Sequence, residues 1–437
     1  MARTAVKQDT VSVGEVVAQA PGVTLSDLRQ VVPGPGMPPD ARIMRSNNNL
    51  DLARHDDGRI YFAFRSAPTH FAHPACRFYV MASDDDGENW QLEAKIKRGR
   101  DMREPRLLSW NGRLFLYFFE AGRTTWKFEP NGIFACERRP DGMWTEPVQI
   151  SPPGYVVWRT KVVNGVPYMT AYSGGANQYA NTDEELGVEL LTTTDGYRWT
   201  PVNSARPAVY RGGGSECDFE IADDGTLYAV IRNEGGGDGY GSLICRAPAD
   251  DITDWRCRLN PRKYDSPLVF KHADEIYILG RRHLRGNGHY DQRWPFLSAP
   301  RRRFAYQILY WLSRKRTSLW RINKETLRVK RIFDLPSRGD TCFPALVPLN
   351  ERQYLVYNYS SPLEGPDKFW FWGQVTQTRI YSQVLTFDQP RSQETEIRGR
   401  MDFRFMPIRR GGSLMWGGKV GGDPPATPTR QDQHERN

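Results

Sequence analysis

The segment DGRIYFAFRS at 57–66 decides the fold, because related segments recur along the whole chain. In each copy, a turn is followed by a strand of alternating or aromatic-rich residues. Asp-Gly or Asn-Gly before β-branched and aromatic residues is the strongest short-range signal for a β-hairpin. The further copies are NGRLFLYFFE (111–120), NGVPYMTAYS (164–173), DGTLYAVIRN (224–233), ADEIYILGRR (273–282) and ERQYLVYNYS (351–360).

A second apolar run precedes each of these turns, so each copy supplies both strands of a hairpin. These runs are NLDLAR, PRLLSW, RTKVV, DFEIA, PLVFK and PALVPL. The copies follow one another at intervals of roughly fifty to eighty residues, which is typical of propeller blades. The sequence therefore predicts an all-β chain, a six-bladed β-propeller built of four-stranded antiparallel blades.

Tryptophans recur in phase with the hairpins. Trp90 closes SDDDGENW (83–90), which fits the pattern Ser/Thr-x-Asp-x-Gly-x-x-Trp, and Trp199 closes the similar TTTDGYRW (192–199). Such a segment is a turn in which Asp and Ser side chains bond the backbone and the Trp packs between blades. Here the chain resembles the sialidase (neuraminidase) superfamily, six-bladed propellers that carry these Asp boxes, or BNR repeats. The resemblance covers about 40–390 and gives the Asp boxes a structural role.

The composition of the two ends sets the expected domain boundaries. We expect a flexible N-terminus over 1–21, the propeller over 22–390 and a largely flexible C-terminal extension over 391–437. Residues 22–33 are expected to supply the outer strand that closes the last blade, which removes a free sheet edge. The segment 283–307 is too long for a turn between strands and predicts an insertion in the fifth repeat.

The bulk composition limits the partners and the compartment. The net charge of +9 suits an anionic partner, but the arginines are scattered among acidic residues, which makes nucleic acid an unlikely ligand. No run of 18 apolar residues predicts a membrane span, and the N-terminus lacks the apolar region of a secretory signal. The six cysteines lie far apart, which favours reduced thiols in a cytoplasmic protein. We expect no metal site and no cofactor.

The expected binding site is a ring around the propeller axis. In an antiparallel hairpin, the residues before the first strand and after the second lie at the same end. Six such ends surround one channel, and here they are rich in arginine and carboxylate, which suits an anionic, polyhydroxylated carbohydrate. The predicted substrate-binding residues are Arg45, Arg65, Arg103, Arg106, Arg159, Arg232, Arg281, Arg282, Asp265 and Asp340.

Carboxylates of the same ring are the predicted catalytic groups. A glycosidase needs two carboxyl groups that flank the scissile bond, one protonated and one ionised. The resemblance implies a functional role for Glu216 and Arg232, because their spacing from the turn at Gly225 matches the family pattern in the fourth repeat. The predicted catalytic residues are Glu216, Asp218, Glu104 and Tyr359.

Three positions depart from the sialidase pattern. Asn48 stands where the first substrate-binding arginine is expected. Cys342 and Phe343 replace the nucleophilic tyrosine before the strand of the sixth repeat. The loop expected to carry an aspartate acid/base contains His70 and His73 instead. The sequence therefore predicts a sialidase-like fold without the usual tyrosine chemistry.

The predicted function is an exo-sialidase-like glycoside hydrolase acting on an anionic or polar glycan. A non-catalytic glycan-binding propeller is the first alternative. A uronate lyase is another, in which Tyr357, Tyr359 or one of His70, His73 and His283 removes a proton. A protein-interaction scaffold that uses the basic insertion remains a third. The sequence leaves open the sugar, the linkage, the stereochemical outcome and the oligomeric state.

Overall fold

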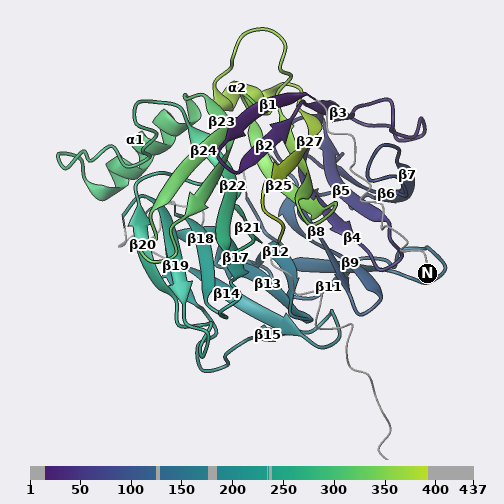
Figure 1. Cartoon of the computed structure of the whole chain (residues 1–437), viewed down its shortest axis with the longest axis horizontal. Coiled ribbons are helices and arrows are strands. Elements are labelled where there is room, and N and C mark those ends of the chain that lie inside the picture. Colours follow the sequence, from purple (N-terminus) through teal and green to yellow (C-terminus); the bar gives the residue numbers. More distant parts are fainter. Residues whose placement is uncertain (1–14, 125–127, 176–184, 234, 236–238, 392–437) are drawn as a thin grey trace, which may run out of the picture. The chain divides into compact units, whose positions relative to one another are not determined.

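A computed structural model describes residues 15–124, 128–175, 185–233, 235 and 239–391. The predicted fold is confirmed: six antiparallel sheets form the six blades of a β-propeller. Figure 1 shows the first strands of the blades gathered around the centre, with the later strands of each sheet further out. In the order of the chain, the blades are numbered 1 to 6 here.

Four blades have the predicted four strands. Blade 1 is β4 (Ser46–Arg54), β5 (Ile60–Ala67), β6 (Arg77–Ser83) and β7 (Gln91–Ile96). Blade 2 is β8 (Asp101–Trp110), β9 (Arg113–Gly122), β10 (Ile133–Arg138) and β11 (Val148–Gln149). Blade 4 is β17 (Gly214–Ile221), β18 (Leu227–Asn233), β19 (Gly241–Ala247) and β20 (Arg256–Asn260). Blade 5 is β21 (Leu268–His272), β22 (Glu275–His283), β23 (Lys315–Ile322) and β24 (Val329–Leu335).

The other two blades carry additional strands. Blade 3 is β12 (Val156–Val163), β13 (Val166–Ser173), β14 (Leu186–Thr193) and β15 (Trp199–Pro201), and β16 (Tyr210–Gly212) also pairs with β14. Blade 6 joins β25 (Thr341–Pro348), β26 (Gln353–Ser360) and β27 (Arg379–Phe387) to three strands from the beginning of the chain. Those strands are β1 (Val16–Ala20), β2 (Val23–Ser26) and β3 (Arg29–Val32).

The ends of the chain close blade 6, as the sequence predicted. Strand β2 pairs with β27 through Val23 and Phe387, and β3 pairs with the same strand. Strand β1 then covers the outer edge of β2. Residues 16–20 are therefore a strand, where a flexible terminus was expected up to residue 21. The expected extension over 391–437 lies outside the described residues except for its first residue.

Hydrogen bonds between neighbouring blades complete the circle. They are largely made by side chains that bond the backbone of the next blade, so each blade is fixed in register with its neighbour. In order around the axis, the pairs are Asp51 with Leu107, Leu107 with Thr160, Thr170 with Cys217, Asp218 with Val269, Arg281 with Thr341 and Thr378 with Asn47.

The predicted insertion in blade 5 contains a helix. Helix α1 (Ala299–Trp311) lies between β22 and β23, and a shorter helix, α2 (Trp370–Val375), lies between β26 and β27. The two helices pack together through Tyr310 and Trp370, whose ring centroids are 5.6 Å apart. Figure 1 places both at the edge of the propeller beside blades 5 and 6.

One expectation about the cysteines is wrong. Cys245 and Cys257 are directly opposite one another on β19 and β20, and they form a disulfide. The other cysteines, Cys76, Cys136, Cys217 and Cys342, are buried free thiols. The sequence separation of the bonded pair gave no recognisable motif, because cross-strand pairing depends on the register of the sheet. The argument for a cytoplasmic location therefore loses its support from reduced thiols, and the location stays a prediction.

Candidate functional site

The ring residues owe their positions to bulges in the inner strands. We call the end of the propeller where β4, β8, β12, β17, β21 and β25 begin the ring end. Near this end the register of five of these strands slips, which leaves extra residues unpaired. A bulge redirects the side chain of its extra residue and is common beside active sites. The slipped positions contain Asn49, Glu104, Trp158, Glu216 and Phe343.

Several bulge residues also have a backbone conformation that a side chain seldom adopts. Glu104 has φ 54° and Phe343 has φ 65°, and each is followed by a proline. Ser266, at the same place before β21, has φ 52° and also precedes a proline. Non-glycine residues in this region carry strain, which is often found at functional sites. The strain here serves to direct the Glu104 and Phe343 side chains at the ring end.

Arg106 joins the groups contributed by the inner strands of blades 1, 2, 3 and 6. Its guanidinium is buried and packs on the rings of Trp158 and Phe343, 5.1 Å and 5.0 Å from their centroids, and the two rings also contact each other. It lies 3.6 Å from Glu104 and 4.0 Å from Asp51. Its Nε and Nη2 atoms make no hydrogen bond within the described part of the chain. Burial lowers the pKa of Arg106 to about 10, so the group stays cationic at neutral pH.

Glu104 is the predicted catalytic residue whose environment departs most from that of an ordinary carboxyl group. It is 7% exposed, and its Oε2 atom has no hydrogen-bond partner among the described residues. Burial raises the pKa of Glu104 to about 7, opposed by the charge of Arg106 and assisted by that of Glu216. A carboxyl group with such a pKa is partly protonated at neutral pH, which is what a general acid requires.

Glu216 has a different environment, although it also lies on a bulge. It is 8% exposed, its Oε1 accepts a hydrogen bond from Arg232, and its Oε2 accepts one from the Ser266 amide at 2.7 Å. Burial raises the pKa of Glu216, whereas the charge of Arg232 opposes the rise. The two donors hold the carboxylate in a single orientation at the ring end.

The predicted arginine pair of blades 4 and 5 surrounds a carboxylate of the protein itself. Asp265 has no exposed surface, and it lies 3.3 Å from Arg232 Nε and 3.4 Å from Arg281 Nη1. Lys263 lies 3.9 Å away, and Tyr310 donates a hydrogen bond to Asp265. These cations overcome burial and lower the pKa of Asp265 to about 2. The two arginines are therefore neutralised internally, and Asp265 has a structural role rather than the predicted contact with substrate.

Asp218 and Arg159 form a clip between blades. Asp218 is fully buried, accepts a hydrogen bond from the Val269 amide at 2.7 Å and lies 3.3 Å from Arg159 Nε. Arg159 also donates to the Pro267 carbonyl at 3.2 Å. Asp218 therefore connects blades 3, 4 and 5, and its catalytic role stays a prediction. Asp51 of blade 1 makes the equivalent hydrogen bond, in which its side chain accepts from the Leu107 amide of blade 2.

Arg65 is a second structural residue among the predicted ligand contacts. It has no exposed surface and donates to Asp101 at 2.5 Å, and also to the Thr69 and Phe71 carbonyls. Arg103 donates to the other oxygen of Asp101 at 2.7 Å but keeps 19% of its side chain exposed. Arg103 is therefore partly exposed while it is paired with Asp101, whereas Arg65 is fully buried and supports the loop after β5.

Asp340 and Tyr359 belong to a buried network with His70. The Tyr359 hydroxyl donates to Asp340 at 2.9 Å, and His70 Nδ1 lies 2.6 Å from the other carboxylate oxygen. Neither Asp340 nor Tyr359 has exposed surface, and a direct contact of either with a ligand stays a prediction. Burial raises the pKa of Tyr359 well above its usual value, and the charge of Asp340 adds to the rise, which keeps this hydroxyl protonated.

The remaining predicted arginines lie elsewhere. Arg282 follows Arg281 on β22, so its side chain points to the opposite face of the sheet, where it pairs with Asp334 at 2.5 Å. It is therefore not a ring residue. Arg45 is exposed and directly precedes β4 at the ring end, where its carbonyl accepts a hydrogen bond from the Thr378 amide. A contact between Arg45 and substrate stays a prediction.

Within the described residues, no group of three His, Cys, Asp or Glu side chains is placed to hold a metal ion. The same residues contain no helix long and apolar enough to span a membrane.

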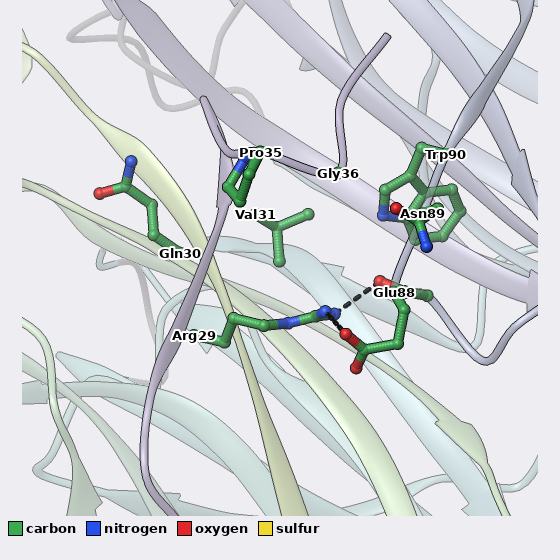
Figure 2. Close-up of a pocket in the computed structure, with 9 residues that line it drawn as sticks. Arg29, Gln30, Val31, Pro35, Gly36, Glu88, Asn89 and Trp90 are labelled. Atoms are coloured by element: carbon green, nitrogen blue, oxygen red, sulfur yellow. Dashed lines mark hydrogen bonds and ion pairs between the residues drawn. The ribbon is translucent and has the colours of Figure 1, made fainter.

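A cavity of about 250 Å³ lies between β3 and the 83–90 turn, at the other end of blade 1 from the ring (Figure 2). There Arg29 pairs with Glu88 and donates to the Gly87 carbonyl at 2.5 Å, so this cavity is lined by a closed ion pair.

No protein-family model and no curated protein matches the sequence. Solved structures do match. A protein of unknown function from Dyadobacter fermentans aligns with a TM-score of 0.56 and 15% identity over 84% of this chain and 100% of its own. A Trypanosoma rangeli sialidase in complex with the inhibitor DANA aligns with a TM-score of 0.54 and 14% identity over 84% of this chain and 60% of its own.

A Penicillium chrysogenum α-L-arabinanase complexed with arabinobiose aligns with a TM-score of 0.50 and 14% identity, over 82% of this chain and 98% of its own. At these identities the similarity establishes the fold alone. The chain is a sialidase-like six-bladed propeller, and it spans less than two thirds of the sialidase's length. Its structural neighbours include glycoside hydrolases of different specificity.

Sequence reasoning missed two features of the ring end. It recognised neither the contact between His70 and Asp340, which are 270 residues apart, nor the packing of Arg106 on two aromatic rings. One signal for the bulges was present in the sequence. A proline follows Glu104, Ser266 and Phe343 at the same place in their repeats. Proline cannot donate to a ladder, so it marks strand ends and bulges.

Proposed function

We propose that this protein is a glycoside hydrolase whose active site lies at the ring end. The observation that carries the proposal is the contrast between two bulge carboxylates, Glu104 and Glu216. A pKa of about 7 and an unbonded Oε2 in the described structure suit Glu104 for protonating the leaving oxygen. Burial raises the pKa of Glu216 as well, but the hydrogen bonds from Arg232 and the Ser266 amide favour its carboxylate form, which suits Glu216 for stabilising positive charge at the anomeric carbon.

The state of the arginines bears on the class of substrate. An acidic sugar needs a cation that is not already neutralised. Arg232 and Arg281 are both within 3.4 Å of Asp265, and both are nearly buried. We therefore propose a polar, uncharged sugar in place of the anionic one. The amide of Asn49, whose Oδ1 makes no hydrogen bond in the described structure, suits a hydroxyl group of such a ligand.

The similarity to other propellers supports this reaction class only in outline. The neighbours named above include a sialidase and an arabinanase, which share the fold and differ in sugar. Phe343 occupies the bulge of β25 and has no group able to form a covalent intermediate. The proposed reaction therefore depends on the two glutamates and does not use the tyrosine nucleophile.

Turnover of a panel of neutral and acidic aryl glycosides tests the proposal. We expect hydrolysis of a neutral member by the wild type and losses of about 100-fold or more in kcat for Glu104→Gln and Glu216→Gln. The control is Glu275→Gln, since Glu275 is an exposed residue whose side chain pairs with Arg321 outside the ring. Binding without turnover by the wild type would indicate a lectin, and an unsaturated product would indicate a lyase; both would contradict the proposal.

A further inference from the structure

The loop between β5 and β6 brings His70 to the ring end. Its backbone is held on two sides, because the His70 amide donates to the Gln374 carbonyl at 3.1 Å and Arg103 donates to the His70 carbonyl at 2.7 Å. Gln374 belongs to α2 and Arg103 to β8, so the loop is fixed between blades 6 and 2. A side chain on such an anchored loop has a defined direction.

The imidazole of His70 is oriented by Asp340. An ionised carboxylate can only accept hydrogen bonds, so the 2.6 Å contact places a proton on His70 Nδ1. Asp340 is itself fixed, because it accepts a second bond from Tyr359 at 2.9 Å. With Nδ1 protonated, the lone pair of the neutral ring is on Nε2. This atom makes no hydrogen bond within the described residues, and the side chain keeps 11% of its surface exposed.

Burial keeps this imidazole neutral. Burial is the main cause that lowers the pKa of His70, and the charges of Arg103 and Arg65 add to the effect. Asp340 opposes it. A neutral imidazole that donates through one nitrogen and presents a lone pair on the other is able to accept a proton.

His70 and Glu104 lie on the same side of the ring. Asn48 Nδ2 is 3.4 Å from His70 Nδ1, and the next residue, Asn49, hydrogen-bonds Glu104. Arg103 precedes Glu104 and donates to the His70 carbonyl. Asn48 and Asn49 of β4 therefore connect the imidazole of His70 with the carboxyl group of Glu104. Arg103 of β8, which directly precedes Glu104, makes a second connection.

We propose that His70 is the catalytic base of this site and that Asp340 and Tyr359 are positioning residues. The inference rests on the proposed hydrolase function. His70 Nε2 accepts a proton from a water molecule while the water oxygen bonds to the anomeric carbon. The bond from this carbon to the leaving oxygen breaks, and Glu104 gives its proton to that oxygen. The imidazolium then returns its proton to solvent, and Glu104 takes one up, which restores both groups.

Replacement of His70 distinguishes this role from a purely structural one. We expect His70→Ala to lower kcat by about 100-fold to 10,000-fold with a KM within a few-fold of wild type. Added imidazole should restore part of the lost kcat, because it fills the gap and supplies the same lone pair. His70→Gln keeps a donor for Asp340 but has no base, so it should fold and be equally inactive. The control is His73→Ala, whose histidine accepts a bond from the Ala75 amide in the same loop.

The outcomes separate this inference from the proposed function. Turnover of a neutral glycoside by His70→Gln at the wild-type rate, with Glu104→Gln inactive, would overturn the role of His70 alone. A loss in His70→Ala that imidazole does not restore would indicate a structural role and would also overturn it. Absence of turnover in the wild type would contradict the hydrolase itself, and this reaction of His70 with it.

Asp340→Asn tests the positioning role by pH. An asparagine can donate to Nδ1, which would leave the lone pair there and place the proton on Nε2. We expect a loss in kcat of about 100-fold or more with KM little changed, since the base would have the wrong tautomer. An unchanged kcat and an unchanged acidic limb of the pH profile would contradict the assignment.

Discussion

The two sides of the ring end contain similar charged residues, which differ in how closely they pair with one another. On the side of blades 4 and 5, Glu216, Arg232, Asp265 and Arg281 neutralise one another through contacts of 3.4 Å or less. On the side of blades 1 and 2, Glu104 and Arg106 are 3.6 Å apart without a hydrogen bond. The buried atoms on this side that lack a hydrogen bond in the described structure include Asn49 Oδ1, Glu104 Oε2, Arg106 Nε and Arg106 Nη2.

This difference indicates where a ligand binds. A buried polar atom without a partner costs about 1–3 kcal/mol, so native proteins retain few of them. A ligand hydroxyl or water that bonds these atoms recovers this free energy. On the side of blades 4 and 5, Asp265 Oδ1 also lacks a hydrogen bond among the described residues, but it lies 3.3 Å from Arg232 Nε, so this ion pair already offsets part of the cost of its burial. The sequence alone predicted one ring of arginines and carboxylates and did not distinguish its two sides.

Asp265→Asn should produce the largest change in stability. It removes the carboxylate that contacts both Arg232 and Arg281, so Arg281 stays buried without its ion pair while Arg232 keeps its pair with Glu216. Breaking a buried ion pair in this way costs about 3–5 kcal/mol. We expect a loss of this size in the free energy of unfolding, measured by urea denaturation at neutral pH.

A matched control uses Asp274→Asn. Asp274 pairs with Lys324 but is 80% exposed, so its loss should cost no more than about 1 kcal/mol. In Asp265→Asn the Arg281 guanidinium, which loses its ion-pair partner, should also bind a uronic acid more tightly than in the wild type. A loss in Asp265→Asn as small as in the control would show that the side of blades 4 and 5 is not internally neutralised.

The pH dependence of Glu104 should be the next largest effect. Burial raises the pKa of Glu104 from 4.5 to about 7, and the acid must be protonated to act. The value of kcat/KM should therefore fall about tenfold per pH unit above this pKa. The free energy of unfolding should also fall as the pH rises, because the folded state binds this proton more tightly than the unfolded state. The contribution is complete below pH 4.5 and is lost as the pH rises through about 7.

Glu104→Gln is the comparison variant for the pH dependence of kcat/KM and of the free energy of unfolding. It should remove the dependence of unfolding free energy on pH that Glu104 contributes between 4.5 and 7. Chemical denaturation at several pH values measures this slope. An identical slope in the variant would mean that Glu104 titrates normally and that the two sides of the ring do not differ in this respect.

Tyr359→Phe should have the smallest effect. It removes one hydrogen bond to Asp340, which is worth about 1 kcal/mol of stability. The carboxylate then becomes more basic and stabilises the charged form of His70, so the acidic limb of the kcat/KM profile should move to higher pH. Tyr277→Phe is the control, since Tyr277 lies in the core shared by blades 5 and 6. A limb that stays in place would exclude the positioning role of Tyr359.

The sequence predicted the blades better than the site. The Asp-Gly and Asn-Gly turns and the alternating strands depend only on neighbouring residues, and all six hairpins were correct. The closing strand at 23–26 followed from the need to cover a sheet edge. Of the predicted site residues, Glu104 and Glu216 lie at the ring end with some exposed surface, whereas Asp218, Arg65 and Tyr359 are buried in structural contacts.

What the sequence determined by itself is local: the turns, the strand periodicity and the number of repeats, because these depend on residues a few positions apart. The tertiary structure decided which charged groups neutralise each other and which remain available. Asp265 meets Arg281 across 16 residues, and His70 meets Asp340 across 270. Such contacts depend on bulges, on register and on closure of the ring. The repeat that predicted the six hairpins contains no information on those pairings.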